Sequence, residues 1–187
     1  MEFNVGENDK LAIFGNNGSG KSTLLQVILG SKMPSEGEVI FKLGQTIIEQ
    51  EEVFKYCSIA APYLELFEEL SLRENIEFQA RFKSFIAGIT PNIILEVSGL
   101  ELVADRPLKQ FSSGMKQRAK LALALLADTF VVLLDEPCSN LDAEGINWYK
   151  KMVSEYSKNR IVIVSSNADM DEAGFCKKNI DIRDFKK

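Results

Sequence analysis

Short apolar runs alternate along the chain with longer segments in which apolar residues recur every three or four positions. The short runs predict β-strands, and several are apolar on both faces, which is typical of parallel strands covered by helices on both sides. The periodic segments predict α-helices. The predicted strands are Leu11–Phe14, Glu38–Leu43, Ser58–Ala61, Phe130–Leu134 and Arg160–Ser165, and the predicted helices cover residues 21–31, 71–85, 91–98, 113–127, 142–157 and 169–176.

Helical patterns with little strand character dominate residues 62–128, and strands are predicted on either side of them. This order predicts an α/β fold with a mainly parallel sheet and a helical insertion, not a separate second domain. We therefore expect a single domain of residues 1–187. Its core would comprise residues 1–61 and 129–187, and its helical subdomain about residues 62–128.

The loop between the first predicted strand and the first predicted helix reads Gly15-Asn16-Asn17-Gly18-Ser19-Gly20-Lys21-Ser22-Thr23. It fits the phosphate-binding pattern G-x-x-x-x-G-K-[ST] in the strand–loop–helix context that this pattern requires. Its glycines allow successive backbone N–H groups to point at one anion, and a helix start favours phosphate. Lys21 is expected to reach the terminal phosphates and Ser22 to bind Mg²⁺. The loop therefore predicts a P-loop NTPase core that binds a nucleoside triphosphate.

Composition narrows the class of protein further. A net charge of −5 and a pI near 5.0 argue against a dedicated nucleic-acid surface. The three cysteines have neither close pairing nor metal spacing, and the start of the chain lacks the features of a signal peptide, so reduced thiols in the cytoplasm are expected. The most apolar stretch, residues 121–134, is too short for a membrane span. There are no histidines.

A second chemical centre follows the strand Phe130–Leu134, where Asp135 and Glu136 are adjacent. Ligands of open α/β sheets gather at the carboxyl ends of the strands, which is where both acids would lie. Adjacent residues of a strand point to opposite sides, so the two acids need not share a task. Asp135 is the predicted Mg²⁺-side group, and Glu136 is predicted to orient and polarise the attacking water.

Three further segments carry a resemblance to a known family. Phe111-Ser112-Ser113-Gly114-Met115-Lys116-Gln117-Arg118 resembles the signature L-S-G-G-Q-x-Q-R of the ATP-binding cassette (ABC) ATPases, and it lies between the helical insertion and the Asp135 strand. Ser139-Asn140-Leu141-Asp142 is similar to that family's D-loop, and residues 66–75 resemble the segment after its Q-loop. The resemblance covers most of the chain in the family's order.

The resemblance implies a head-to-tail pair of cassettes, in a homodimer or heterodimer, that closes on ATP and opens after hydrolysis. The signature residues Ser112, Ser113, Gly114 and Met115 of one chain would contact the nucleotide held by Lys21 of another. Asp142 of the D-loop would belong to the same site. The resemblance also implies a transmembrane permease partner, which places the chain in the cytoplasm, peripheral on the cytoplasmic face of the membrane.

The chain departs from the family pattern at several positions. The Q-loop glutamine expected near Ala61 or Pro62 is absent, and Asn167 lies where the switch histidine is expected. An amide can hydrogen-bond a γ-phosphate but cannot carry a proton, so slow hydrolysis is expected. Ser113 replaces a glycine of the signature, and Met115 replaces a glutamine.

The sequence before Gly15 is too short for the family's opening strands and for the aromatic residue that stacks on adenine. Phe3 lies too close to the loop to fill that role. Either the N-terminus is truncated or the nucleotide is held mainly by its phosphates.

Other functions stay open at this point. A kinase or GTPase would share the phosphate loop but not the signature, and no N-K-x-D guanine motif is present. A non-transport ABC ATPase would usually carry a second cassette or coiled-coil arms. A nucleotide-binding regulator with little hydrolysis is favoured by the missing glutamine and histidine, whereas Glu136 favours an enzyme. Cys138, beside this acid, is interpreted as a small buried residue and not as a redox centre.

Overall fold

The computed structural model describes residues 2–185. The chain divides into two compact units. The first unit comprises residues 1–59, 129–135 and 159–187, and the second comprises residues 60–128 and 136–158. The second unit therefore contains the predicted helical subdomain together with the segment that follows Asp135.

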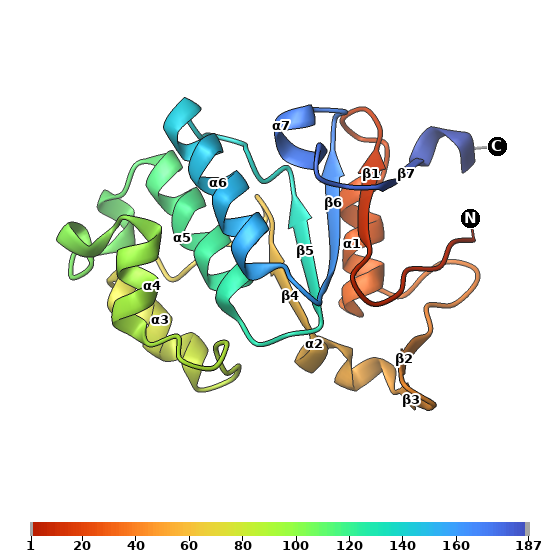
Figure 1. Cartoon of the computed structure of the whole chain (residues 1–187), viewed down its shortest axis with the longest axis horizontal. Coiled ribbons are helices and arrows are strands. Elements are labelled where there is room, and N and C mark those ends of the chain that lie inside the picture. Colours follow the sequence, from red (N-terminus) through yellow and green to blue (C-terminus); the bar gives the residue numbers. More distant parts are fainter. Residues whose placement is uncertain (1, 186–187) are drawn as a thin grey trace. The chain divides into compact units, whose positions relative to one another are not determined.

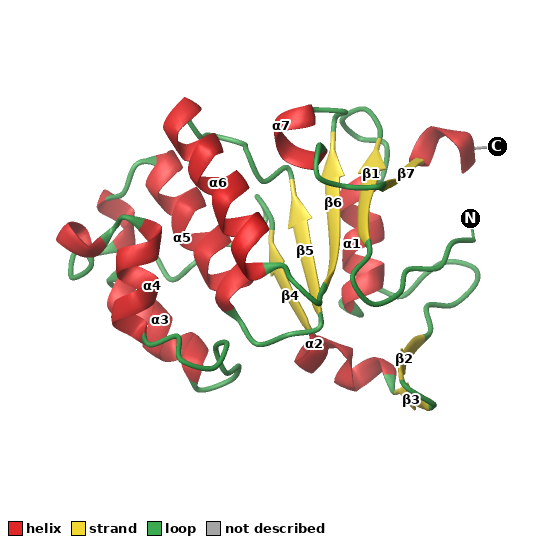
Figure 2. Ribbon diagram, viewed as in Figure 1, coloured by secondary structure: helices red, strands yellow, loops and turns green. Residues whose placement is uncertain are grey.

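A parallel sheet organises the first unit (Figures 1 and 2). It has five strands in the order β4-β5-β6-β1-β7. Their bounds are β1 Lys10–Phe14, β4 Cys57–Ala60, β5 Val131–Asp135, β6 Ile161–Ser166 and β7 Lys178–Asp181. β6 pairs in parallel with β5 and β1, and β1 pairs in parallel with β7. The α/β fold with a parallel sheet is thereby confirmed.

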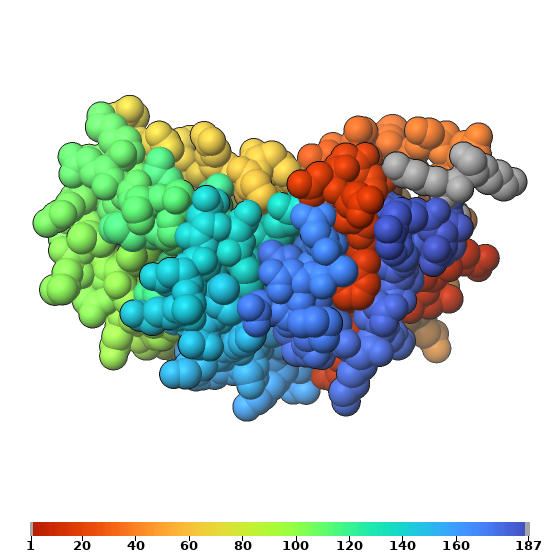
Figure 3. All heavy atoms as spheres, turned by 90° about the horizontal axis from the view of Figure 1, so that it is seen from above, coloured from red at the N-terminus to blue at the C-terminus, as the bar shows by residue number. Residues whose placement is uncertain are grey.

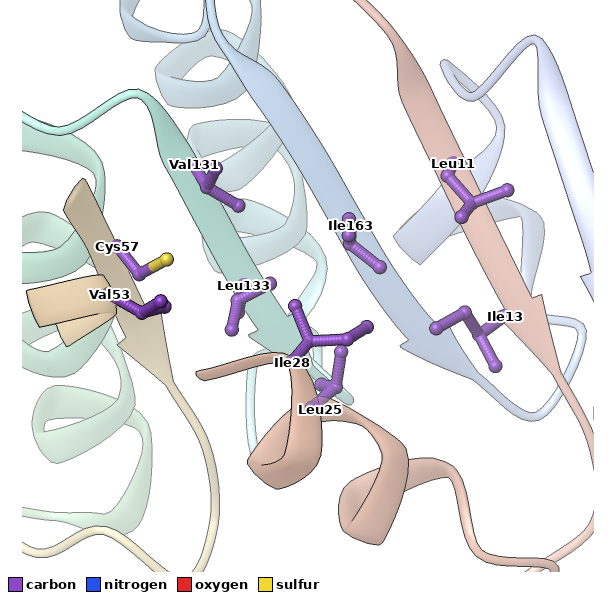
Figure 4. Packing of buried hydrophobic residues seen from close by; sticks show 9 residues of the cluster. All are labelled: Leu11, Ile13, Leu25, Ile28, Val53, Cys57, Val131, Leu133 and Ile163. Atoms are coloured by element: carbon purple, nitrogen blue, oxygen red, sulfur yellow. The ribbon is translucent and has the colours of Figure 1, made fainter. Parts of the chain in front are cut away.

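Helix α1, Lys21–Leu29, follows the phosphate loop and packs on the sheet. Figure 4 shows Leu25 and Ile28 of α1 directed toward Leu133 of β5 and Ile163 of β6. The helix ends at Gly30, whose left-handed backbone directs its N–H to the carbonyls of the last turn. This apolar contact holds the start of α1 at the carboxyl ends of the strands.

The predicted strand Glu38–Leu43 was wrong in its extent and its sheet. Only Phe41–Leu43 forms a strand, β2, and it pairs antiparallel with β3, Thr46–Ile48, in a separate two-stranded sheet. The short α2, Val53–Tyr56, and the edge strand β7 were not predicted, because both are brief and neither has a clear apolar period.

Four helices make up most of the second unit, with bounds α3 Leu72–Ala80, α4 Pro91–Ser98, α5 Ser113–Leu126 and α6 Ala143–Tyr156. The spacing of Ser71 and Glu74 predicts a capping box, and both of its hydrogen bonds are present at the start of α3. This helix ends five residues before the predicted position 85. The Trp148 indole of α6 donates to the Val97 carbonyl of α4 at 2.7 Å, which ties these two helices together.

The remaining helical turns are short. They are α7, Met170–Ala173, and four 3₁₀ turns, Gln50–Glu52, Glu101–Val103, Leu108–Gln110 and Ile182–Phe185. α7 is shorter than the helix predicted over residues 169–176. Within residues 2–185, no helix has the length and apolar character that crossing a membrane requires.

Candidate nucleotide-binding site

The predicted phosphate loop lies at the carboxyl ends of the parallel strands of the first unit. Figure 3 looks down on this edge, with the loop in orange-red and the segment after β6 in blue. The sheet register sets Ser165 of β6 opposite both Ile13 of β1 and Asp135 of β5. Groups far apart in the sequence therefore meet at one edge of the sheet.

The loop backbone has the conformation that anion binding needs. Gly18 and Gly20 have φ values of 73° and 104°, in the left-handed region that other residues rarely adopt. The Ser19 N–H donates to the Asn16 carbonyl at 3.0 Å and closes the turn. The buried Ser19 hydroxyl oxygen has no hydrogen-bond partner among residues 2–185. The loop thus carries a buried polar group as well as backbone N–H groups that a phosphate can satisfy.

Gly15 is required by packing. A Cβ added there would lie 2.5 Å from the Ser19 hydroxyl oxygen and 2.6 Å from Cγ2 of Ile182. Ile182, in the last 3₁₀ turn, therefore packs against the loop at Gly15. No sequence pattern pointed to this residue.

We expect Gly15→Ala to weaken ATP binding by roughly tenfold or more, since overpacking costs about 1–3 kcal/mol and would displace Ser19. Isothermal titration of the folded variant measures this loss. Gly37→Ala is the matched control, because a Cβ at Gly37 meets no atom within 4 Å, although its left-handed φ of 80° adds some strain. Equal ATP affinity of Gly15→Ala and the parent would contradict the packing role.

Lys21 is buried at the first position of α1, and its ammonium group is held inside the loop. Its Nζ donates to the Gly15 carbonyl at 2.8 Å, to the Asn16 carbonyl at 3.2 Å and to Oδ1 of Asn167 at 2.7 Å. The predicted phosphate-reaching cation and the predicted replacement of the switch histidine are therefore in direct contact. These hydrogen bonds fix the positions of both groups.

Asp135, the last residue of β5, is buried, with 1% of its surface exposed. Its Oδ1 accepts a hydrogen bond from the Ser165 hydroxyl, whereas its Oδ2 is buried with no hydrogen-bond partner in the described part of the chain. An unpartnered carboxylate oxygen is costly unless a cation or water satisfies it. Ser22 lies in the first turn of α1. This donor set fits Mg²⁺, which takes one or two protein oxygens and completes its shell with water and phosphate.

Glu136 follows Asp135 and begins the segment that belongs to the second unit. Its φ of 45° lies in the left-handed region, which is uncommon for a residue with a side chain and costs about 1–3 kcal/mol. The turn after it is closed by the Ser139 N–H, which donates to the Glu136 carbonyl at 3.0 Å. Gln117 of α5 holds the same turn, because its side-chain amide donates to the Pro137 carbonyl at 2.8 Å. The strained backbone at Glu136 is thus maintained by two separate contacts.

The predicted signature residues form the start of α5. The Ser112 hydroxyl caps the helix by accepting from the Met115 N–H at 3.2 Å, and both Ser112 and Ser113 are exposed. A Cβ on Gly114 would lie 2.9 Å from the Asn140 carbonyl, so only glycine allows this close approach to the D-loop segment. The exposed start of this 14-residue helix is suited to a phosphate oxygen from another molecule.

Asp142 caps α6, since its Oδ1 accepts from the Gly145 N–H at 2.8 Å. Cys138 is buried, in agreement with its interpretation as a small packing residue. Phe3 packs against the apolar cluster of the first unit. Sequence reasoning missed Ser165, Ser166 and Glu172, which form buried hydrogen bonds at the end of β6. The only signal in the sequence was the change from apolar residues to Ser165-Ser166 at the end of that strand.

Comparison with known proteins shows which proteins this chain is similar to. A family model described as ABC transporter matches residues 1–139. The Bacillus subtilis protein named uncharacterized ABC transporter ATP-binding protein YhcH is 33% identical over 173 residues, covering 89% of this chain and 55% of that protein. Human ATP-binding cassette sub-family A member 10 is 32% identical over 181 residues, covering 91% of this chain and 11% of that protein.

Among solved structures, a dimeric post-hydrolysis state of the ATP-binding cassette MJ0796, bound to ADP and Pi, has a TM-score of 0.78. It is 25% identical, and the match covers 96% of this chain and 83% of that chain. The chain spans only 11% and 55% of the length of the two curated relatives. These proteins therefore contain further sequence beyond the region that matches.

Proposed function

Because the chain belongs to the ABC transporter family, whose ATP-binding cassettes energise transport, we propose that it binds and hydrolyses MgATP to drive a transporter. The predicted family, the ATP-binding cassette and the ATPase class are confirmed by that membership. One observation carries the proposal for this chain. The buried Lys21 ammonium is held by two loop carbonyls and by Asn167, at the edge of the sheet where Asp135 has an unpartnered oxygen.

Separate residues of the site would bind the phosphates, hold Mg²⁺ and orient the attacking water. The loop residues 15–23 bind the phosphates, and Lys21 exchanges a contact with a carbonyl or with Asn167 for one with the terminal phosphates. Ser22 and Asp135 would hold Mg²⁺, which neutralises charge on the phosphate oxygens. Glu136 orients the attacking water and polarises it, and Asn167 orients the γ-phosphate through its amide.

The full site requires a second cassette. In the proposed head-to-tail pair, Ser112, Ser113 and Gly114 of one chain contact the γ-phosphate held by Lys21 of the other, with Met115 and Asp142 beside them. The exposed and capped start of α5 supports this arrangement, as does the dimer of the related cassette. A transmembrane permease is the proposed third component, with this chain on the cytoplasmic face of the membrane. No nucleic-acid partner is proposed.

Phosphate release from purified protein with MgATP tests the proposed hydrolysis, and co-purification from membranes with mass spectrometry tests the permease partner. Saturable ATP binding without turnover would favour the second candidate, a nucleotide-binding regulator. The absence of histidine from the sequence is the observation that favours it, because the switch position then cannot carry a proton. Absence of both ATP binding and turnover would overturn both candidates.

Asn167→Ala is expected to slow turnover by about tenfold, since it removes one hydrogen bond to a charged group. Asn167→His is expected to hydrolyse ATP at the parent rate or faster. The parent rate should lack an imidazole-like inflection between about pH 6 and 7, where histidine titrates, and Asn167→His should introduce one. Steady-state kinetics across this pH range measure both effects. If Asn167→Ala hydrolyses ATP as fast as the parent, Asn167 has no role in hydrolysis.

A further inference from the structure

A buried acid in α7 has no part in the mechanism above. Glu172 is only 6% exposed, and its Oε2 accepts a hydrogen bond from the hydroxyl of Ser166, the last residue of β6, at 2.5 Å. Ser166 is itself fully buried. A buried carboxylate is retained only where polar contacts compensate for its desolvation. This acid therefore has a defined partner at the end of the strand that leads to Asn167.

The same serine hydroxyl closes the turn that carries Asn167. Its oxygen accepts from the Asp169 N–H at 3.0 Å, so Ser166 joins Glu172 on one side to Asp169 on the other. Ala168 lies between Ser166 and Asp169 in the sequence and has a φ of 68°, a left-handed conformation that alanine disfavours. Tertiary contacts must hold such a turn, because its residues do not prefer it.

The turn presents the Asn167 amide to the phosphate loop. Asn167 is the residue between Ser166 and the strained Ala168, and its Oδ1 accepts from Lys21 Nζ at 2.7 Å. The path from Glu172 to Lys21 consists of the hydrogen bond from Ser166 to Glu172, the peptide link between Ser166 and Asn167, and the hydrogen bond from Lys21 to Asn167, all within the first unit. This path connects Glu172 to the Asn167 amide that contacts Lys21.

We propose that Glu172 is a positioning residue for ATP hydrolysis, which holds the Ser166 hydroxyl and thereby sets the orientation of the Asn167 amide beside Lys21. This inference rests on the proposed function of Asn167. In this proposal Glu172 does not bind the nucleotide itself. It acts through the turn, so its removal affects turnover more than nucleotide affinity, which the loop residues 15–23 supply.

The decisive experiment is a double-mutant cycle. Glu172→Ala is expected to lower kcat about tenfold with little change in ATP affinity, since a hydrogen bond to a charged group is lost. In the Asn167→Ala background, Glu172→Ala should cause no further loss, because both changes disable the same amide. Glu172→Gln retains an acceptor oxygen for Ser166 and should restore most of the turnover. Asp171→Ala is the matched control, because it removes an exposed acid from the same helix and should have no effect on kcat.

A second measurement does not depend on turnover. The side-chain NH₂ signals of Asn167 in a ¹⁵N-labelled protein, assigned by their loss in Asn167→Ala, should shift or broaden in Glu172→Ala but not in Glu172→Gln. Ser166→Ala provides the same test if Glu172→Ala does not fold. Additive losses in the cycle, or unchanged Asn167 signals, would overturn the positioning role. If the parent does not hydrolyse ATP, the proposed function fails while the signals of Asn167 still decide this inference.

Discussion

Glu136→Gln is expected to bind ATP as tightly as the parent and to lose turnover by roughly 100-fold to 10,000-fold. The amide keeps the shape of the side chain but cannot accept a proton from the attacking water, and positioned bases contribute rate factors of this size. Since hydrolysis releases the proposed cassette pair, dimers with trapped ATP should accumulate. Phosphate release, nucleotide titration and size-exclusion chromatography with MgATP measure the three effects.

Glu155→Gln is the matched control for this prediction, because it makes the same chemical change at an exposed position of α6. It should alter neither turnover nor dimer formation. Glu136→Gln keeps the shape of the side chain, and the contacts that hold this turn are made by the carbonyls of Glu136 and Pro137, so both variants should unfold at nearly the parent temperature. Wild-type turnover by Glu136→Gln would assign this acid to a structural role and leave Asn167 as the main group beside the γ-phosphate.

Lys21→Ala is expected to reduce ATP affinity by roughly a hundredfold or more, beyond detection in a standard titration. Removing one partner of a buried charge pair costs about 2–5 kcal/mol, and the missing charge is the one proposed to bind the terminal phosphates. Isothermal titration with MgATP measures the loss. Lys32→Ala, an exposed lysine after α1, is the control for the loss of one positive charge.

The Lys21 contacts with Gly15 and Asn16 also make the variant informative about the loop itself. Without the ammonium group, both carbonyls lose a donor, so thermal unfolding must be compared to separate a loosened loop from a lost phosphate contact. A folded Lys21→Ala variant that still binds ATP with parental affinity would refute phosphate binding by this loop, and with it the proposed hydrolysis.

Features that depend on short spacings were predictable from the sequence. The phosphate loop and the Ser71 capping box are built from contacts between residues a few positions apart, so a local pattern specifies them. The apolar strands β1, β5 and β6 were predicted because a run that is buried on both faces has few alternatives. The family followed from the order of the phosphate loop, the signature-like residues 111–118 and the D-loop-like residues 139–142, and it was confirmed.

Weakly patterned segments were not predictable. The hairpin of β2 and β3 is exposed and lies outside the parallel sheet, so its apolar residues gave a misleading strand signal at Glu38–Leu43. The edge strand β7 has no apolar run, and only its pairing with β1 makes it a strand. The roles assigned to Ser112, Ser113, Met115 and Asp142 at a nucleotide remain predictions, because they require a second chain.

The sequence by itself determined the phosphate loop, the adjacent acids Asp135 and Glu136 and the family, because each is encoded within a few consecutive residues. Only the tertiary structure decided which distant groups meet. Lys21 and Asn167 are 146 positions apart, and the parallel register of β1 with β6 brings them to 2.7 Å. The same register sets Ser165 against Asp135 and leaves Oδ2 of that acid without a partner. Strand order and register depend on how apolar faces pack, and no local pattern contains that information.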